Sequence, residues 1–344
     1  MDNIPRNFGH NSKTSEELNK KNLKAKKRGF RLDFNKHGLK VDLYNTKFFR
    51  RIIRKSLIKL GLFQKLKTKK KELLVKYKLK QKINNIISDL TKNRLPLFDT
   101  ISIETFSKCN GGCSFCPVNR FDDPRPDNLM DEELFKKIIL NLYDLEYNGQ
   151  LILSLNNEPF LDKRIYKFAE IARSYLPAAF ISIWSNGTAL NIDRFKKIII
   201  NLDELIIDNY NDDLTWHNNI QEIMEHLTLD KTHVNKVKFR MRFENDVLDT
   251  RAGQAKNRDF IKPLDISCLY PFISINVQVN GDISLCCNDA LSKEVVGSVV
   301  NKNLEEIWHS DKYYDYRKKI NNSRKLVSIC EGCDTVDIPK PSAN

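Results

Sequence analysis

Three cysteines lie within eight residues of one short segment, "CNGGCSFC", at Cys109, Cys113 and Cys116. Cysteine thiolates bind soft metal ions, but a structural zinc ion requires four ligands that close its tetrahedron. Three thiolates instead suit a [4Fe–4S] cluster that keeps one iron open to a ligand from outside the protein. Gly111 and Gly112 allow the segment to wrap around a bulky group. We therefore predict an iron–sulfur cluster here, with zinc as the alternative.

The cellular environment decides how the eight cysteines of this 344-residue chain are interpreted. The amino terminus, "MDNIPRNFGHNSKTSEEL", lacks the apolar core of a signal peptide. No segment has the ~18 to 20 consecutive apolar residues of a membrane-spanning helix. We therefore expect a cytoplasmic protein whose thiols stay reduced, so that clustered cysteines bind metal or do chemistry rather than form disulfides.

Strand and helix patterns alternate along the middle of the chain, where the first cysteine group lies. Apolar, β-branched strands are expected at 100–106, 151–157, 180–187, 204–210 and 236–243, with amphipathic helices at 130–147, 162–176, 192–202 and 214–228. This alternation is typical of an α/β fold made of parallel βα units, either an open sheet or a barrel. Functional groups of such folds gather at the carboxyl ends of the strands, and the first cysteine group directly follows the first strand. The pattern assigns five strands and does not locate a sixth.

The alternation of strand and helix patterns ends before Cys268, and a different order of elements is expected after it. A β-hairpin is expected at 272–287, with its turn at Asn280 and Gly281. One helix is expected at 303–320, because Asn303 and Glu306 form the sequence signature of a capping box. The remaining cysteines are Cys268, Cys286, Cys287, Cys330 and Cys333.

The cysteine segment resembles the signature of the radical S-adenosylmethionine (radical SAM) enzymes, in which an aromatic residue precedes the last cysteine. Two later segments match that family in the expected order. "LNNEPFL" at 155–161 is similar to its Gly-Gly-Glu-Pro segment, although Asn156 and Asn157 replace the glycines, and "WSNGTAL" at 184–190 is similar to its Ser-Asn-Gly turn.

This resemblance implies a partial (β/α)6-type barrel, with Cys109, Cys113 and Cys116 holding a [4Fe–4S] cluster whose open iron binds SAM. It also implies contacts to SAM from a small set of residues: Phe115, Asn157, Glu158, Ser185 and Asn186. In such enzymes an electron from the cluster cleaves SAM to a 5′-deoxyadenosyl radical, which abstracts hydrogen from the substrate.

The C-terminal cysteines, together with "DTRAGQ" at 249–254, are similar to the SPASM or twitch domain that follows many radical SAM cores. The resemblance implies an auxiliary [4Fe–4S] cluster held by Cys268, Cys286, Cys330 and Cys333, with zinc as the alternative. Four thiolates would leave no iron for substrate, so that cluster would transfer electrons or stabilise the fold. Cys287 is interpreted as a buried residue or alternative ligand, or as a hydrogen-atom donor.

The implied organisation has four parts: a basic helical extension at 1–95, a radical SAM core at 96–262, a SPASM/twitch-like domain at 263–336 and a polar tail at 337–344. We expect the enzyme to oxidise a carbohydrate or cyclitol. One alternative is a maturase that oxidises, crosslinks or epimerises a peptide or protein side chain. A second alternative, of another class, is a zinc-stabilised non-catalytic binding protein.

Residues 1–95 hold 28 Lys and Arg against 7 Asp and Glu, whereas the rest of the chain is mildly acidic. This balance argues against a core that binds nucleic acid. Within the basic part, 47–63 has the pattern of a basic amphipathic helix. It suits an anionic membrane surface, RNA, or an acidic ferredoxin or flavodoxin that delivers electrons, and a solvated extension is the remaining interpretation.

Other charged residues have plainer interpretations. Arg240 and Arg242 share one face of a strand, where each suits a structural ion pair or a carboxylate ligand. His217, His226 and His233 show no metal-ligand spacing and are interpreted as surface histidines.

Overall fold

A computed structural model describes residues 30–35, 38–43, 74, 77, 78, 81, 82, 85, 96–210, 214–242, 248–255, 257, 264 and 267–335. The chain divides into two compact units, Met1–Leu74 and Val75–Asn344. In the described part of the chain, no helix has the length and apolar character needed to cross a membrane.

The first unit contains a two-stranded antiparallel sheet of β1 (Phe30–Asn35) and β2 (Gly38–Leu43). The extension predicted to be helical at 1–95 therefore contains two strands, at 30–35 and 38–43. The amphipathic helix predicted at 47–63 lies outside the described residues.

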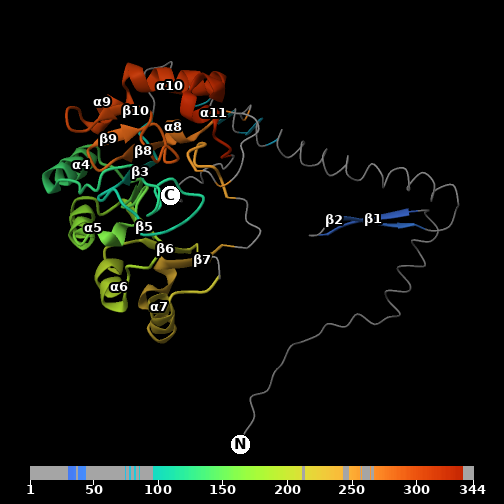
Figure 1. Cartoon of the computed structure of the whole chain (residues 1–344), viewed down its shortest axis with the longest axis horizontal. Helices are drawn as coiled ribbons and strands as arrows, with labels where there is room; N and C mark the ends of the chain where they lie inside the picture. The colour runs from blue at the N-terminus through green and yellow to red at the C-terminus, as the bar shows by residue number, and fades with distance from the viewer. Residues whose placement is uncertain are drawn as a thin grey trace, which may run out of the picture. The chain divides into compact units, whose positions relative to one another are not determined.

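The second unit is built on one sheet of eight strands in the order β10-β9-β8-β3-β4-β5-β6-β7. Figure 1 shows helices α4 to α7 side by side along one side of it. The successive βα units are β3 (Thr100–Ile103), α4 (Glu132–Asp144), β4 (Gln150–Ile152), η1 (Pro159–Leu161), α5 (Ile165–Tyr175), β5 (Phe180–Ser185), α6 (Ile192–Ile199), β6 (Glu204–Asn209), α7 (Asn218–Leu229), η2 (Lys231–Lys236) and β7 (Val237–Met241).

The C-terminal part continues the same sheet. Its elements are α8 (Tyr270–Ile273), β8 (Ser274–Val277), β9 (Asp282–Ser284), β10 (Val295–Ser298), α9 (Leu304–Trp308), α10 (Asp311–Asn322), η3 (Arg324–Leu326) and α11 (Ser328–Glu331). β8 pairs in parallel with β3, and β9 and β10 then follow antiparallel. β8 and β9 confirm the hairpin predicted at 272–287, but β8 is also the sixth parallel strand, a pairing with β3 that the sequence pattern did not predict. The sheet therefore runs across the boundary predicted at 262/263.

The single helix predicted at 303–320 is in fact two helices. Asn303 and Glu306 form the expected capping box of α9, but that helix ends at Trp308. Ser310 then caps α10, since its side chain accepts a hydrogen bond from the backbone N–H of Tyr313. A serine in an extended conformation at this point ends one helix and begins the next.

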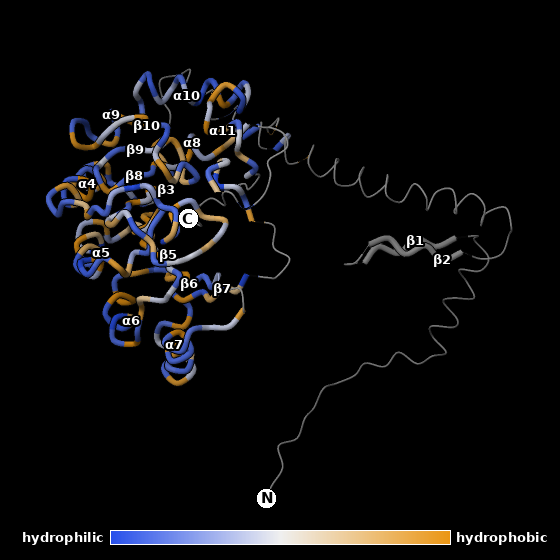
Figure 2. Tube along the Cα trace, in the orientation of Figure 1, coloured by the Kyte–Doolittle hydropathy of each residue, from blue (hydrophilic) through white to orange (hydrophobic). Residues whose placement is uncertain are grey.

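The parallel strands have two chemically different faces. Ile101, Ile103, Leu151, Ile183 and Ile207 are fully buried in the core that the helices cover. The alternate positions, which face the other side of the sheet, carry Ser102, Glu104, Ser182 and Asp208, all buried. Figure 2 shows the mixed hydrophobic and hydrophilic character along the covering helices. A buried sheet face rich in polar side chains is where a polar ligand site is expected, because buried polar groups need partners.

Candidate functional site

The cysteine segment predicted to hold a cluster forms the loop after β3. A Cβ at Gly111 would lie 3.5 Å from the Cys109 sulfur and 3.6 Å from the Cys113 sulfur, so Gly111 lies between the two thiols. The Gly111 N–H also points at the Cys109 sulfur, at 3.3 Å. Burial raises the pKa of Cys109 to about 12, with Glu158, Cys116 and Cys113 contributing. Metal binding must therefore displace this proton.

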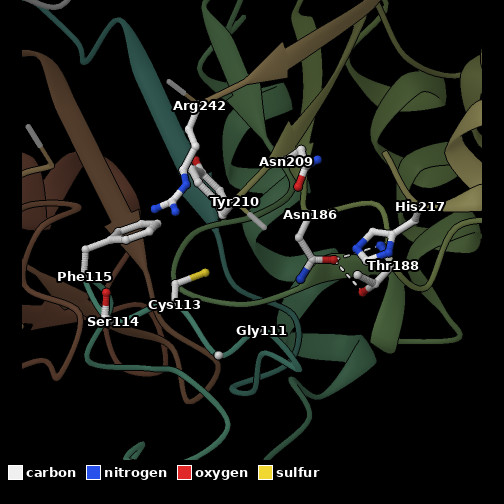
Figure 3. A pocket seen from close by; sticks show the side chains of 11 residues that line it. Gly111, Cys113, Ser114, Phe115, Asn186, Thr188, Asn209, Tyr210, His217 and Arg242 are labelled. Atoms are coloured by element: carbon white, nitrogen blue, oxygen red, sulfur yellow. Dashed lines mark hydrogen bonds between the residues drawn. The ribbon is translucent and has the colours of Figure 1, made fainter. Parts of the chain in front are cut away.

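A cleft opens directly beside this loop, at the carboxyl ends of the parallel strands (Figure 3). Residues 111–115 of the cysteine loop form one part of it. The rest comes from the carboxyl ends of β5, β6 and β7 or from the start of α7: Asn186, Thr188, Asn209, Tyr210, His217 and Arg242. The ring of Phe115 meets Tyr210 edge-on, with centroids 5.1 Å apart. The cleft therefore combines the Cys113 thiol, aromatic rings, amides and a guanidinium within one site.

The Ser-Asn-Gly turn after β5 brings Asn186 to the cysteine loop. Its Nδ2 donates to Asn110 Oδ1 at 3.1 Å and to the Cys109 sulfur at 3.7 Å. Its Oδ1 accepts from the backbone N–H of Thr188 at 2.9 Å. Two of the residues predicted to contact SAM, Phe115 and Asn186, thus line the cleft.

Glu158 lies behind the cleft and holds this turn in place. Its Oε1 accepts from the Ser185 hydroxyl at 2.7 Å, and its Oε2 accepts from the Asn186 N–H at 2.8 Å. Oε1 also accepts from the Phe160 N–H at 3.1 Å, so Glu158 caps the short helix η1. Burial raises the pKa of Glu158 to about 7, although hydrogen bonds from Ser185, Asn186 and Phe160 oppose the rise. Of the predicted SAM contacts, Glu158 and Ser185 are buried, and Asn157 turns its Oδ1 to the Leu155 N–H at 3.0 Å.

The two strand arginines have different surroundings. Arg240 pairs with Asp208, its Nη2 lying 2.6 Å from Oδ2, and its guanidinium stacks over Trp184 at 4.6 Å. The ion-pair interpretation is therefore confirmed for Arg240. Arg242 and His217 instead line the cleft, which corrects the interpretation of His217 as a surface residue. Arg242 follows β7 and His217 precedes α7, so both lie at the carboxyl edge of the sheet. This position in the βα pattern is the sequence feature that could have identified them as cleft residues.

Arg251, from the "DTRAGQ" segment, lies near the cysteines, and the sequence analysis did not predict this location. It donates through Nη2 to Asn156 Oδ1 and lies close enough to Cys116 and Cys287 for their charges to interact. Asn156, the replacement for a glycine in the family's pattern, is itself buried. Arg251 thus places a half-buried cation near both Cys116 of the first cysteine group and Cys287.

A second pocket gathers the four cysteines predicted as auxiliary ligands, Cys268, Cys286, Cys330 and Cys333. Its other walls are largely apolar, including Leu285 and Ile329. Burial raises the pKa of Cys286 and Cys330, and the neighbouring thiols add to the rise. Cys287 does not line this auxiliary pocket.

The donor types at both sites suit iron–sulfur clusters. Each site gathers cysteine thiols, and in a cluster each iron takes its own thiolate. Among the described residues, no group of three or more Cys, His, Asp or Glu side chains is arranged to hold a single metal ion.

Comparison with known families agrees with this geometry. Residues 103–234 match the model of the radical SAM superfamily, and residues 268–334 match the SPASM iron–sulfur cluster-binding domain. This chain is a radical SAM enzyme. The recognition made from its motifs is confirmed, and its cofactors are SAM, the radical SAM [4Fe–4S] cluster and an auxiliary [4Fe–4S] cluster. The alternative of a zinc-stabilised binding protein is left without support.

This radical SAM enzyme is also similar to individual proteins of known activity or structure. It is 28% identical over 244 residues to the S-adenosyl-L-methionine-dependent 2-deoxy-scyllo-inosamine dehydrogenase of Niallia circulans, covering 70% of this chain and 95% of that enzyme. The crystal structure of BtrN in complex with AdoMet and 2-DOIA matches with a TM-score of 0.63 and 25% identity, over 72% of this chain and 97% of that one. Selenomethionine BtrN in an open conformation matches with a TM-score of 0.53 and 23% identity, over 70% and 94% of the two chains.

Proposed function

We propose that this radical SAM enzyme is a dehydrogenase that oxidises an alcohol group of a cyclitol or aminocyclitol. The observation that carries the proposal is the likeness to the 2-deoxy-scyllo-inosamine dehydrogenase, which extends over 95% of that enzyme. The fold match to BtrN, with a TM-score of 0.63, supports it.

The cleft beside the cysteine loop is the proposed SAM site. Cys109, Cys113 and Cys116 would hold the cluster, and Phe115, Asn186, Tyr210 and Arg242 offer the ring faces, amide and cation that suit an adenine, a ribose and a carboxylate. When bound, the cluster and SAM supply a 5′-deoxyadenosyl radical that takes a hydrogen atom from a substrate carbon. Glu158 would act on this site indirectly, by holding the Ser185–Asn186 turn.

Cys268, Cys286, Cys330 and Cys333 are the proposed ligands of the auxiliary cluster. Because four thiolates close such a site, substrate would not ligate it, which leaves electron transfer or a structural role. This arrangement favours oxidation of a small molecule over a reaction in which the substrate binds to the auxiliary iron.

The electron donor is proposed to be an acidic ferredoxin or flavodoxin. The support is the excess of Lys and Arg in residues 1–95, 28 against 7 acidic residues, which would attract an acidic partner at low ionic strength. An alternative proposal is that the same basic segment contacts an anionic membrane surface.

The test uses the full-length protein, reconstituted anaerobically with iron and sulfide and supplied with SAM and dithionite. The substrate panel is 2-deoxy-scyllo-inosamine, the corresponding cyclitol without the amino group, and a simple hexose. We expect one cyclitol to yield a ketone in proportion to 5′-deoxyadenosine, and deuterium on the oxidised carbon to appear in 5′-deoxyadenosine. Release of 5′-deoxyadenosine without consumption of either cyclitol would show radical SAM chemistry on another class of substrate.

A further inference from the structure

Arg324, the first residue of η3, is a buried cation beside the auxiliary pocket. Its side chain is only 3% exposed, and it lines the pocket together with the four cysteines. Its Nη1 donates to the Cys333 sulfur at 3.7 Å and to the Thr335 carbonyl at 2.9 Å, and its Nη2 donates to the Ser267 carbonyl at 3.4 Å. None of these acceptors is a carboxylate.

A buried guanidinium without an anionic partner is unfavourable, and proteins normally pair such a charge. Among the described residues that line the auxiliary pocket, the four cysteine thiols are the groups that would become anionic on binding iron. The Arg324 guanidinium hydrogen-bonds to the Cys333 sulfur and lines the same pocket as Cys268 and Cys330. A cluster held by four thiolates carries net negative charge, so loading the auxiliary pocket would give Arg324 an anionic partner that its acceptors among the described residues do not provide.

We propose that Arg324 raises the reduction potential of the auxiliary cluster. Reduction adds an electron to a site that is already negative, so a buried positive charge stabilises the reduced state more than the oxidised state. A hydrogen bond to a ligating sulfur acts in the same direction, because it withdraws charge from the sulfur. Arg324 is in this sense a positioning residue, and it makes the cluster a better electron acceptor, as oxidation of a substrate requires. The proposal rests on the auxiliary ligand set given above.

The test is a redox titration followed by electron paramagnetic resonance. It uses the full chain with Cys109, Cys113 and Cys116 replaced by alanine, so that the auxiliary cluster gives the only signal. Three further substitutions are compared in this background. Arg324→Gln removes the charge, Arg324→Lys keeps it without the planar fork, and Lys325→Gln removes an exposed charge from the adjacent position of η3.

We expect Arg324→Gln to lower the midpoint potential, Arg324→Lys to restore most of it and Lys325→Gln to leave it unchanged. Loss of the cluster from Arg324→Gln but not from Arg324→Lys would also support the proposal, because it would show that the positive charge at this position stabilises the anionic cluster. An unchanged potential in a fully loaded Arg324→Gln variant, or failure of lysine to rescue, would overturn the proposal. Absence of any cluster in the unsubstituted background would instead refute the ligand assignment, which keeps the two failures distinct.

Discussion

Both carboxylate oxygens of Glu158 accept hydrogen bonds from the chain itself, and the side chain is 1% exposed. Its pKa is raised from 4.5 to about 7, first because burial disfavours the charged form. The folded protein therefore keeps this proton to a higher pH than the unfolded chain does. It follows that the stability contributed by Glu158 is greatest at low pH and falls as pH rises from about 4.5 to 7.

Replacing Glu158 by glutamine should remove that dependence on pH. Relative to the variant, the native protein should lose of order 3 kcal/mol of unfolding free energy between pH 4.5 and pH 7 and change little above that. Urea denaturation at several pH values measures the difference. Glu133→Gln, at an exposed carboxyl of α4, is the matched control. Parallel curves for the native protein and Glu158→Gln would contradict the assignment.

Replacing cysteines at the two cluster sites should have different effects on SAM cleavage and on product formation. Cys113→Ala should abolish SAM cleavage, because the first cluster would lose one of its three thiolates. Cys330→Ala should leave some uncoupled cleavage to 5′-deoxyadenosine but no oxidised product, because only the auxiliary cluster is lost. Iron analysis and product analysis measure both effects.

Cys287→Ala serves as the control for this series, since Cys287 does not line the auxiliary pocket. It should keep the full iron content of both clusters. Loss of the auxiliary cluster from this variant would place Cys287 among the ligands, and full turnover by Cys330→Ala would refute an essential auxiliary cluster.

The turn between β5 and α6 shows how an element positions a functional side chain. Gly187 has φ +76°, and a Cβ there would lie 2.7 Å from Ile220 Cδ1. Only glycine fits both the backbone angle and the contact. The preceding residue, Asn186, is the one that reaches the cysteine loop.

Gly187→Ala should therefore destabilise the fold by about 1–3 kcal/mol and also weaken SAM binding, because the turn must shift. Thermal unfolding and equilibrium binding of SAM measure the two effects. Gly281→Ala, at φ +84° in the β8–β9 hairpin, introduces similar backbone strain away from the cleft. That variant should lose stability but keep its affinity for SAM. Equal affinity in both variants would show that the β5 turn does not position the ligand.

At the scale of the whole molecule, most of the basic segment, Met1–Leu74, is one unit, and the catalytic part belongs to the other, Val75–Asn344. Deleting residues 1–74 should leave iron content and dithionite-driven SAM cleavage intact. Turnover driven by flavodoxin should fall several-fold at low salt, because the positive charge that attracts an acidic donor is lost. Steady-state rates of the native and the truncated protein at increasing ionic strength measure this loss. The difference between the two rates should decrease as salt screens the attraction of the native protein for its donor. An unchanged flavodoxin-driven rate would leave the segment to another partner.

The sequence by itself determined the chemistry of the first cysteine group and the βα character of the core. Three ligands within one loop are a local property, so their spacing favours a cluster with an open iron over zinc, and the resemblance to radical SAM enzymes then supplies SAM as the ligand of that iron. The alternation of apolar strands and amphipathic helices is local as well, and five of the six parallel strands followed from it.

Only the tertiary structure decided which distant segments meet. The sixth parallel strand, β8, lies more than 170 residues after its neighbour β3, and pairing over that distance leaves no signal in either segment. Arg242 and His217 enter the cleft, and Arg324 the auxiliary pocket, for the same reason. A side chain's partners depend on how the whole core packs, whereas the spacing of ligands within a loop is already fixed by the order of residues.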